Sequence, residues 1–170
     1  MKNQNIVLFG FMGCGKTTVG NELSVKTRRE MVDTDSLIEQ SEGMTISEIF
    51  RQHGESYFRD REHEICRSLS ERSRLIISAG GGALTFQRNI DALKKGCVLV
   101  LIDVTPEVIY DRLANDNTRP LLQCEDKMAA IRDLYAKRDS IYRAAADVTV
   151  NGNQPKGFVA LDIMKAVGIL

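Results

Sequence analysis

The segment Gly10–Thr17 has the residue types and the spacing of a phosphate-binding loop. It reads G-x-x-x-x-G-K-T, follows the apolar run Asn5–Phe9 and precedes a helical pattern over Thr17–Thr27. In such a strand–loop–helix unit, backbone N–H groups and the helix dipole stabilise a polyphosphate. Lys16 would add a charge at the β- and γ-phosphates, and the Thr17 hydroxyl could reach a bound magnesium ion. Because an ordinary glycine-rich turn would rarely match all the fixed positions, we predict that the chain binds a nucleoside triphosphate.

Two carboxylates, Asp33 and Asp35, follow the short apolar segment Met31–Val32. If the backbone there is extended, both side chains project to the same side, at a strand end that borders the ligand crevice of a parallel sheet. Asp33 could then hold a water of the magnesium shell, and Asp35 could accept the proton of a substrate hydroxyl. The alternative is that either aspartate caps the helical pattern that begins at Ser36, since aspartate strongly favours the N-cap position.

Arg59 and Glu62 are neighbours on one face of a predicted helix and could form an ion pair. A solvated charged face is the usual explanation for such a cluster, and we accept it for Asp60 and Arg61. Farther along, Gly80–Gly82 follows an apolar strand. Three glycines remove side chains where a ligand could approach the backbone closely, although a tight turn would also explain them.

Three more arginines could take part in chemistry. Arg119 lies in the polar and poorly periodic stretch 115–125, which we predict to be a mobile loop. An arginine on such a loop can swing onto transferring phosphates, although a solvent-exposed arginine beside Pro120 is the simpler interpretation. Arg112 and Arg138 carry no distinctive pattern by themselves.

Apolar strands alternate with helices along the whole chain. Helix starts are indicated by the capping-box pattern of Thr45 and Glu48 and by Pro106 at a first helical position, and Gly54 should separate a short helix from a longer one. The alternation predicts a three-layer α/β/α fold with a central five-stranded parallel sheet. The expected strands are Asn5–Phe9, Met31–Val32, Leu75–Ala79, Cys97–Asp103 and Ala146–Val150.

Composition limits the possible partners and compartments. At 170 residues the chain should form one domain, and its 23 basic and 23 acidic residues imply no bulk attraction to nucleic acid or to an anionic membrane. The longest apolar run, Cys97–Ile102, is too short to span a bilayer, and no secretory signal is apparent. The four cysteines are far apart, which argues against a zinc site or a disulfide framework and favours a reducing cytoplasm.

Taken together, these segments resemble the shikimate kinase family. The resemblance runs through the phosphate loop, D-T-D, F-R-x-x-E, the triple glycine, R-P-L-L, R-x-x-x-Y and A-D-V-T-V, in order over about 140 residues. It implies a P-loop NTPase fold of the nucleoside monophosphate kinase type. It also implies a single kinase domain over residues 1–170, with a substrate-binding region at about 33–62 and a mobile lid at about 112–125. Met31 departs from the family, which more often has an aromatic residue there, and this difference concerns packing.

The resemblance also implies an activity and a role for each matching residue. The activity is transfer of the γ-phosphoryl group of ATP to the 3-hydroxyl of shikimate, giving shikimate 3-phosphate and ADP for chorismate and aromatic amino acid biosynthesis, by a monomer that uses Mg²⁺. Two arginines, each with a planar donor fork, can clamp the carboxylate of shikimate. The implied nucleotide-binding residues are Gly13, Cys14, Gly15, Lys16, Thr17, Thr18, Arg112 and Arg119. The implied magnesium ligands are Thr17 and Asp33, and the implied shikimate-binding residues are Asp35, Arg59, Glu62, Gly81, Gly82 and Arg138. The implied catalytic residues are Lys16, Asp35 and Arg119.

Two other kinds of protein share the phosphate loop. Another small P-loop kinase, for gluconate or a nucleoside monophosphate, would use different acceptor-site residues. A nucleotide-dependent regulatory module without phosphoryl transfer would be expected to lose Lys16, Asp35 or an acceptor-site arginine. A GTPase switch would need an N-K-x-D segment, and no asparagine in this chain is followed by lysine.

Overall fold

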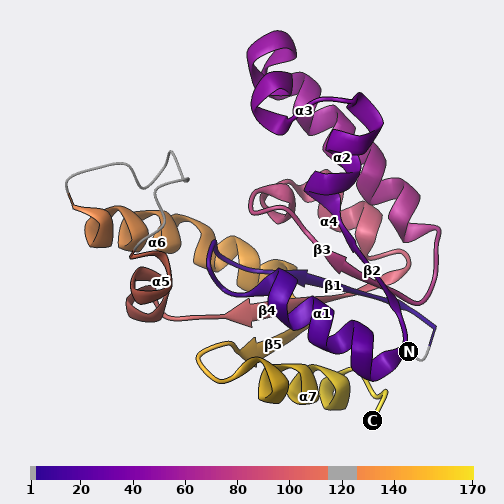
Figure 1. The fold of residues 1–170 in the computed structure, drawn as a ribbon, viewed down its shortest axis with the longest axis vertical. Coiled ribbons are helices and arrows are strands. Elements are labelled where there is room, and N and C mark those ends of the chain that lie inside the picture. Colours follow the sequence, from indigo (N-terminus) through magenta and orange to yellow (C-terminus); the bar gives the residue numbers. More distant parts are fainter. Residues whose placement is uncertain (1–2, 115–125) are drawn as a thin grey trace.

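A computed structural model describes residues 3–114 and 126–170 of the chain. Its strands are β1 (Asn5–Phe9), β2 (Glu30–Asp33), β3 (Leu75–Ser78), β4 (Cys97–Asp103) and β5 (Val148–Asn151). Its helices are α1 (Lys16–Thr27), α2 (Thr34–Glu42), α3 (Ile46–Ser70), the short 3-10 helix η1 (Ala83–Thr85), α4 (Gln87–Leu93), α5 (Pro106–Leu113), α6 (Lys127–Ala145) and α7 (Lys156–Ala166). The strands form one parallel sheet in the order β2-β3-β1-β4-β5 (Figure 1).

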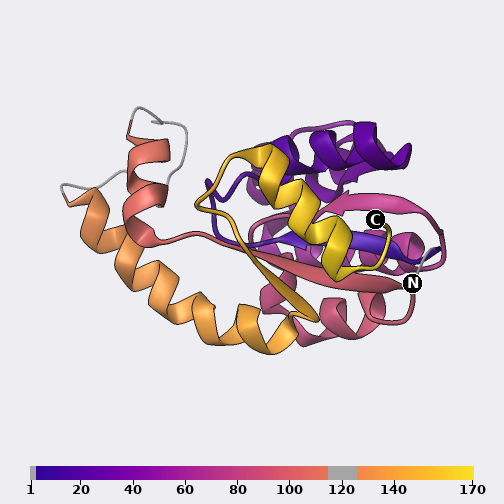
Figure 2. The ribbon, with the colours of Figure 1, turned by 90° about the horizontal axis from the view of Figure 1, so that it is seen from below.

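The sheet is covered on both faces, and β1 shows how. Ile6 and Leu8 pack with residues of α1 and α7, whereas Val7 and Phe9 pack with residues of α3, α4 and α6. Figure 2 shows the yellow α7 and the orange α6 on opposite sides of the sheet. A fully buried strand needs apolar side chains on both faces, which is why β1 and β4 are almost continuously apolar. The predicted three-layer α/β/α fold is therefore confirmed.

A smaller apolar cluster joins α2 to α3, at the top of Figure 1. Thr45 and Glu48 cap the start of α3 reciprocally, in agreement with the predicted capping box. The same helix is interrupted at Gly54, whose backbone angles (φ 81°, ψ 175°) are not helical. Glu55 therefore begins a second helical segment, and this segment carries Arg59 and Glu62.

Element boundaries differ from the sequence predictions by one or two residues. β3 ends at Ser78, one residue earlier than predicted, and β5 begins two residues later than predicted, at Val148. Such shifts are typical where a strand end passes into a turn. Within the described residues, no helix combines the length and the apolar content that a membrane span requires.

Candidate active site

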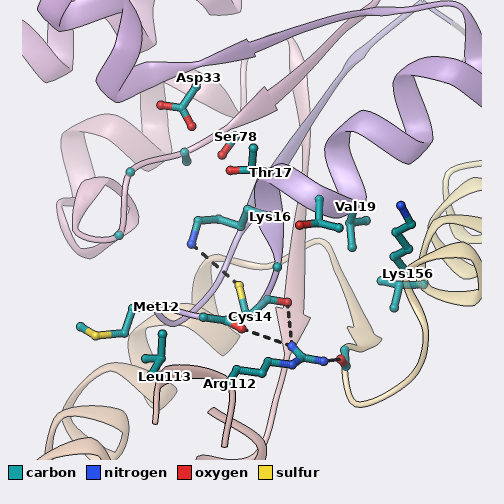
Figure 3. Close-up of a pocket in the computed structure, with 18 of the residues that line it drawn as sticks. Met12, Cys14, Lys16, Thr17, Val19, Asp33, Ser78, Arg112, Leu113 and Lys156 are labelled. Atoms are coloured by element: carbon teal, nitrogen blue, oxygen red, sulfur yellow. Dashed lines mark hydrogen bonds between the residues drawn. The ribbon is translucent and has the colours of Figure 1, made fainter. Parts of the chain in front are cut away.

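A cavity of about 690 Å³ opens at the carboxyl end of the sheet (Figure 3). Its wall is built from the phosphate loop, the ends of β2 and β3, the last turn of α5 and the segment between β5 and α7. The sequence-predicted residues that line it are Gly13, Cys14, Gly15, Lys16, Thr17, Thr18, Asp33, Asp35, Gly81 and Arg112. Segments far apart in the sequence therefore meet at one concave surface.

The phosphate loop presents donors to this cavity. Gly15 is the N-cap of α1 with φ 96°, a left-handed conformation that glycine adopts at low cost, and no side chain caps the helix. The first amides of α1 are therefore available to an anion, where the helix dipole favours negative charge. Lys16 Nζ lies 3.3 Å from Gly10 O and 3.8 Å from Cys14 Sγ, so the ammonium is held over the loop. Cys14 itself is buried and serves as a small residue there.

The two aspartates reach the cavity in a different way from the one that the sequence predicted. The expectation of an extended pair with parallel side chains is wrong, because Asp35 lies in the first turn of α2. Asp33 is the N-cap, and its Oδ1 accepts hydrogen bonds from the amides of Asp35 (3.0 Å) and Ser36 (3.2 Å). The capping alternative was therefore correct for Asp33 and not for Asp35. Both carboxylates nevertheless line the cavity.

Asp35 has an environment that suits a proton acceptor. Burial raises the pKa of its carboxyl, the nearby Asp33 charge raises it further, and Lys16 partly opposes both effects. A carboxylate whose pKa is raised in this way binds a proton more readily, and groups with perturbed pKa values cluster at functional sites.

The glycine corner, Gly80–Gly82, is where the remaining predicted residues converge. A Cβ at Gly80 would overlap Asp35 Oδ1, and a Cβ at Gly82 would lie 3.1 Å from Arg59 Nη1. Arg138 Nη1 donates to Gly81 O at 3.1 Å, and the Tyr142 hydroxyl donates to the same oxygen. Side chains from α2, α3 and α6 thus meet at one tripeptide, next to the cavity that the phosphate loop lines.

Arg59 and Glu62 form the predicted ion pair, with Arg59 Nη1 3.1 Å from Glu62 Oε1. Glu62 is only 1 % exposed and also accepts from Asn89 Nδ2 at 3.2 Å. Burial raises the pKa of its carboxyl, although Arg59 acts in the opposite direction. Arg59 and Asn89 therefore hold the carboxylate of Glu62 in place, and Glu62 in turn holds the guanidinium of Arg59. Arg59, Glu62, Gly82 and Arg138 do not line the large cavity but adjoin it through the glycine corner.

Arg112 makes contacts that its sequence surroundings did not indicate. Its guanidinium donates to Gly13 O (3.2 Å), Cys14 O (3.3 Å) and Gly152 O (2.8 Å), as Figure 3 shows. It ties α5 to the phosphate loop and to the segment before α7. Arg119 lies outside the described residues, as does most of the predicted lid.

Three polar residues of the cavity were missed by the sequence analysis: Ser78, Gln154 and Lys156. Ser78 is 1 % exposed and pairs in register with Asp33 across β2 and β3, so only knowledge of the strand order could have placed it at this site. Gln154 donates to Asp162 Oδ2 at 2.6 Å. Neither Gln154 nor Lys156 belongs to a motif that the sequence analysis could use.

The donors present suit a magnesium ion carried in with a nucleotide. Thr17 and Asp33 line the same cavity, and the helix cap occupies only one oxygen of Asp33. Magnesium in kinases is typically held by one or two protein oxygens, with phosphates and waters completing the shell. The described residues contain no group of three or more histidine, cysteine, aspartate or glutamate side chains that could hold a metal by themselves.

Comparison with known proteins identifies the family. A family model described as shikimate kinase matches residues 12–167. The chain belongs to the shikimate kinase family. It is 41 % identical to the shikimate kinase of Caldanaerobacter subterraneus over 87 % of this chain and 86 % of that protein. The shikimate kinase of Neisseria gonorrhoeae is 40 % identical over 88 % of this chain and 89 % of its own length.

Solved structures agree with this assignment. A shikimate kinase from Acinetobacter baumannii in complex with shikimate has a TM-score of 0.87 and 39 % identity, covering 96 % of this chain and 92 % of that chain. A gluconokinase from Sinorhizobium meliloti has a TM-score of 0.53 and 14 % identity over 97 % of this chain and 91 % of its own, a likeness of fold alone. The resemblance to shikimate kinases noted in the sequence is thereby confirmed.

Proposed function

We propose that this shikimate kinase family member transfers the γ-phosphoryl group of ATP to the 3-hydroxyl of shikimate and releases shikimate 3-phosphate and ADP. The observation that carries the proposal is the convergence of Asp35, Arg59 and Arg138 on the glycine corner, beside a cavity lined by the phosphate loop. This arrangement puts an anion-binding helix N-terminus next to a group of side chains suited to a hydroxylated carboxylic acid.

The phosphate loop would hold the nucleotide. Its amides and Lys16 neutralise the β- and γ-phosphates, so that charge moving onto the leaving oxygen is already compensated. Thr17 and Asp33 would hold the Mg²⁺ of the nucleotide, directly or through a water, and the bound ion supplies charge neutralisation of the phosphates. Arg112, Gln154 and Lys156 line the same cavity and would border the base and ribose.

The glycine corner would hold the acceptor. The planar donor groups of Arg59 and Arg138 match a carboxylate, and binding the carboxylate fixes the orientation of the shikimate ring. Gly81 and Gly82 have no side chains, so their backbone leaves room for the ring. Asp35 would accept the proton of the hydroxyl while that oxygen bonds to the γ-phosphorus and the bond from phosphorus to the β-γ bridging oxygen breaks. The reaction then depends mainly on alignment of the two substrates.

The direct test is ADP release from ATP with shikimate, gluconate, AMP or no acceptor. We expect rapid release with shikimate only. Release that is equal with and without shikimate, or faster with gluconate or AMP, would overturn the proposal. Phosphorus–proton coupling in the NMR spectrum of the shikimate product locates the phosphoryl group.

Arg138→Ala is expected to weaken shikimate binding by about 2–4 kcal/mol, which is about 30-fold to several hundredfold in KM, because a charge-assisted contact to a carboxylate is lost. The nucleotide KM should change little. Arg132→Ala is a matched control, since Arg132 lies on the same helix and makes an exposed ion pair with Glu107. A shikimate KM unchanged by Arg138→Ala would remove this arginine from the acceptor site.

Gly80→Ala is expected to lower kcat by about tenfold to a hundredfold, since the new methyl group must displace the carboxylate of Asp35 and small misplacements are costly in catalysis. Gly157→Ala serves as the control, because a Cβ there meets nothing within 4 Å. Steady-state kinetics and thermal melts of both variants separate misplacement from unfolding. A Gly80→Ala enzyme with normal kcat would show that turnover does not depend on the position of the Asp35 carboxylate against Gly80.

The proposal extends to the whole chain. Residues 1–170 would form one kinase domain, with a substrate-binding region at about 33–62 and a lid at about 112–125 that brings Arg119 to the transferred phosphoryl group. We propose a monomer in a reducing cytoplasm, which is supported by the free thiols of Cys14, Cys66 and Cys97. Sedimentation velocity should give a species of 19.0 kDa.

A further inference from the structure

The guanidinium of Arg59 has two carboxylate partners, one buried and one exposed. Glu62 is 1 % exposed and accepts from Nη1 with both of its oxygens, at 3.1 and 3.2 Å. Glu55 is 64 % exposed, and its Oε1 alone accepts from Nε and Nη2, both at 3.3 Å. The Nε–Nη2 edge is one of the guanidinium edges that present two parallel N–H donors and can therefore form a two-pronged pair with a carboxylate. One exposed glutamate therefore occupies such a docking edge of an acceptor-site arginine.

Other groups fill the remaining space around this guanidinium. Its central carbon lies 5.1 Å from the ring centre of Phe58 and 4.8 Å from that of Phe86. The backbone of Gly82 lies against Nη1 and Nη2, where a Cβ would come within 3.1 and 3.2 Å. Of these neighbours, Glu55 is the one that solvent reaches most freely and that a rotation of its own side chain can remove.

Charge balance requires one partner to leave when an acid binds. Arg59 already faces two carboxylates, and a third beside them would add like-charge repulsion. Glu62 is buried and held also by Asn89, so its separation from Arg59 would leave a buried carboxylate without a counter-charge. An exposed ion pair such as that of Glu55 contributes little and separates readily.

We propose that Glu55 is an exchangeable counter-ion of Arg59, which leaves the guanidinium when the carboxylate of the acceptor arrives and thereby lowers affinity for that acceptor. The inference rests on the proposed function of Arg59 in acceptor binding. Its consequence is selectivity: a hydroxylated ring without a carboxylate cannot replace Glu55, so it does not gain Arg59 as a partner. Glu55 also follows the break at Gly54, and an acidic residue at a helix start is favourable on its own account.

The experiment compares the shikimate KM at saturating ATP, and the shikimate Kd from calorimetry, in the wild type and three variants. Glu55→Gln removes the charge. Glu55→Asp keeps the charge and shortens its reach. Glu64→Gln is the matched control, because Glu64 is 55 % exposed and pairs with Arg61 on the same helix. We expect both Glu55 variants to bind shikimate about two- to fivefold more tightly with kcat little changed, and Glu64→Gln to behave as wild type.

Each other outcome has a definite meaning. Weaker shikimate binding by Glu55→Gln would overturn the proposal, because Glu55 would then be positioning Arg59. Unchanged binding would overturn it as well. If Glu55→Gln binds shikimate more tightly and Glu55→Asp does not, the charge of Glu55 lowers affinity by general repulsion of the acceptor carboxylate. The proposed exchange on Arg59 would then be wrong. If the wild type phosphorylates shikimate while the Glu55 variants fail the test, only this inference falls; a wild type inactive toward shikimate would remove the proposed function with it.

Discussion

Replacing Lys16 by alanine is expected to lower kcat/KM for shikimate phosphorylation by about a hundredfold to a thousandfold, the size of effect seen when a preorganised group that neutralises developing charge is removed. The ammonium of Lys16 lies over the phosphate loop, 3.3 Å from Gly10 O, at the N-terminus of α1. Lys16 brings a full positive charge to the phosphate loop, and the backbone amides of the loop cannot replace that charge. Coupled measurement of ADP release gives kcat/KM, and calorimetry gives the nucleotide Kd.

Lys26→Ala is the appropriate control for this variant. Lys26 lies in the last turn of the same helix and pairs with Glu22 at 3.2 Å, away from the cavity. We expect Lys26→Ala to retain wild-type turnover and both variants to melt near the wild-type temperature. Near-normal phosphoryl transfer by a folded Lys16→Ala enzyme would refute the role proposed for the loop.

Asp35→Asn is expected to lower kcat by about a hundredfold to ten-thousandfold, the range for loss of a general base, while the shikimate KM changes much less. The amide keeps the shape of the carboxylate and can still meet a hydroxyl, but it cannot take its proton. Asp133→Asn is the control, since Asp133 is an exposed carboxylate on α6. An Asp35→Asn enzyme with near-normal kcat would assign proton removal to another group.

The raised pKa of Asp35 gives this prediction a pH signature. Because the carboxylate must be ionised to act, the acid limb of the wild-type kcat/KM profile should lie above 3.8, the ordinary value for aspartate. Asp35→Asn should flatten that limb. A wild-type profile that falls only near the ordinary aspartate value would contradict the environment described for Asp35.

The effect on stability has the opposite sign. A raised folded-state pKa means that the native protein holds this proton at a pH where the unfolded chain has released it, so stability falls as pH rises from the unfolded to the folded pKa. Ionised Asp35 therefore destabilises the fold at neutral pH. Asp35→Asn should raise the Tm near pH 7, and the difference should vanish below 3.8, the ordinary pKa of aspartate.

The phosphate loop could be predicted because its residues are contiguous. The phosphate loop, the strand before it and the helix after it lie within Asn5–Thr27, and local patterning is enough to specify them. The same holds for the capping box at Thr45 and for Pro106 at the start of α5. Asp35 lines the cavity as predicted, but through a backbone geometry that the sequence analysis did not expect, because the strand β2 passes directly into α2 and a single residue, Asp33, decides where one ends and the other begins.

The rest of the cavity and the glycine corner depend on contacts that local patterns do not encode. Arg138 reaches Gly81 across 57 positions, and Arg112 reaches Gly13 across 99. Neither arginine has distinctive neighbours, so only the family resemblance singled them out. Ser78 and Gln154 were missed for the same reason: their importance arises from the strand order and from where α7 begins, which a single sequence does not specify.

The cap at Asp33 links the two aspartates, because a change at Asp33 affects both the helix that carries Asp35 and the charge beside it. One oxygen of Asp33 orders the first turn of the helix that carries Asp35, while the carboxylate also lines the cavity beside Thr17. Truncation to alanine removes both functions at once, whereas asparagine, itself a good N-cap, removes only the charge. In a thermodynamic cycle with Asp35→Asn, both Asp33 variants should show the coupling free energy of the two charges, and the alanine variant alone should also lose the stability that the cap contributes.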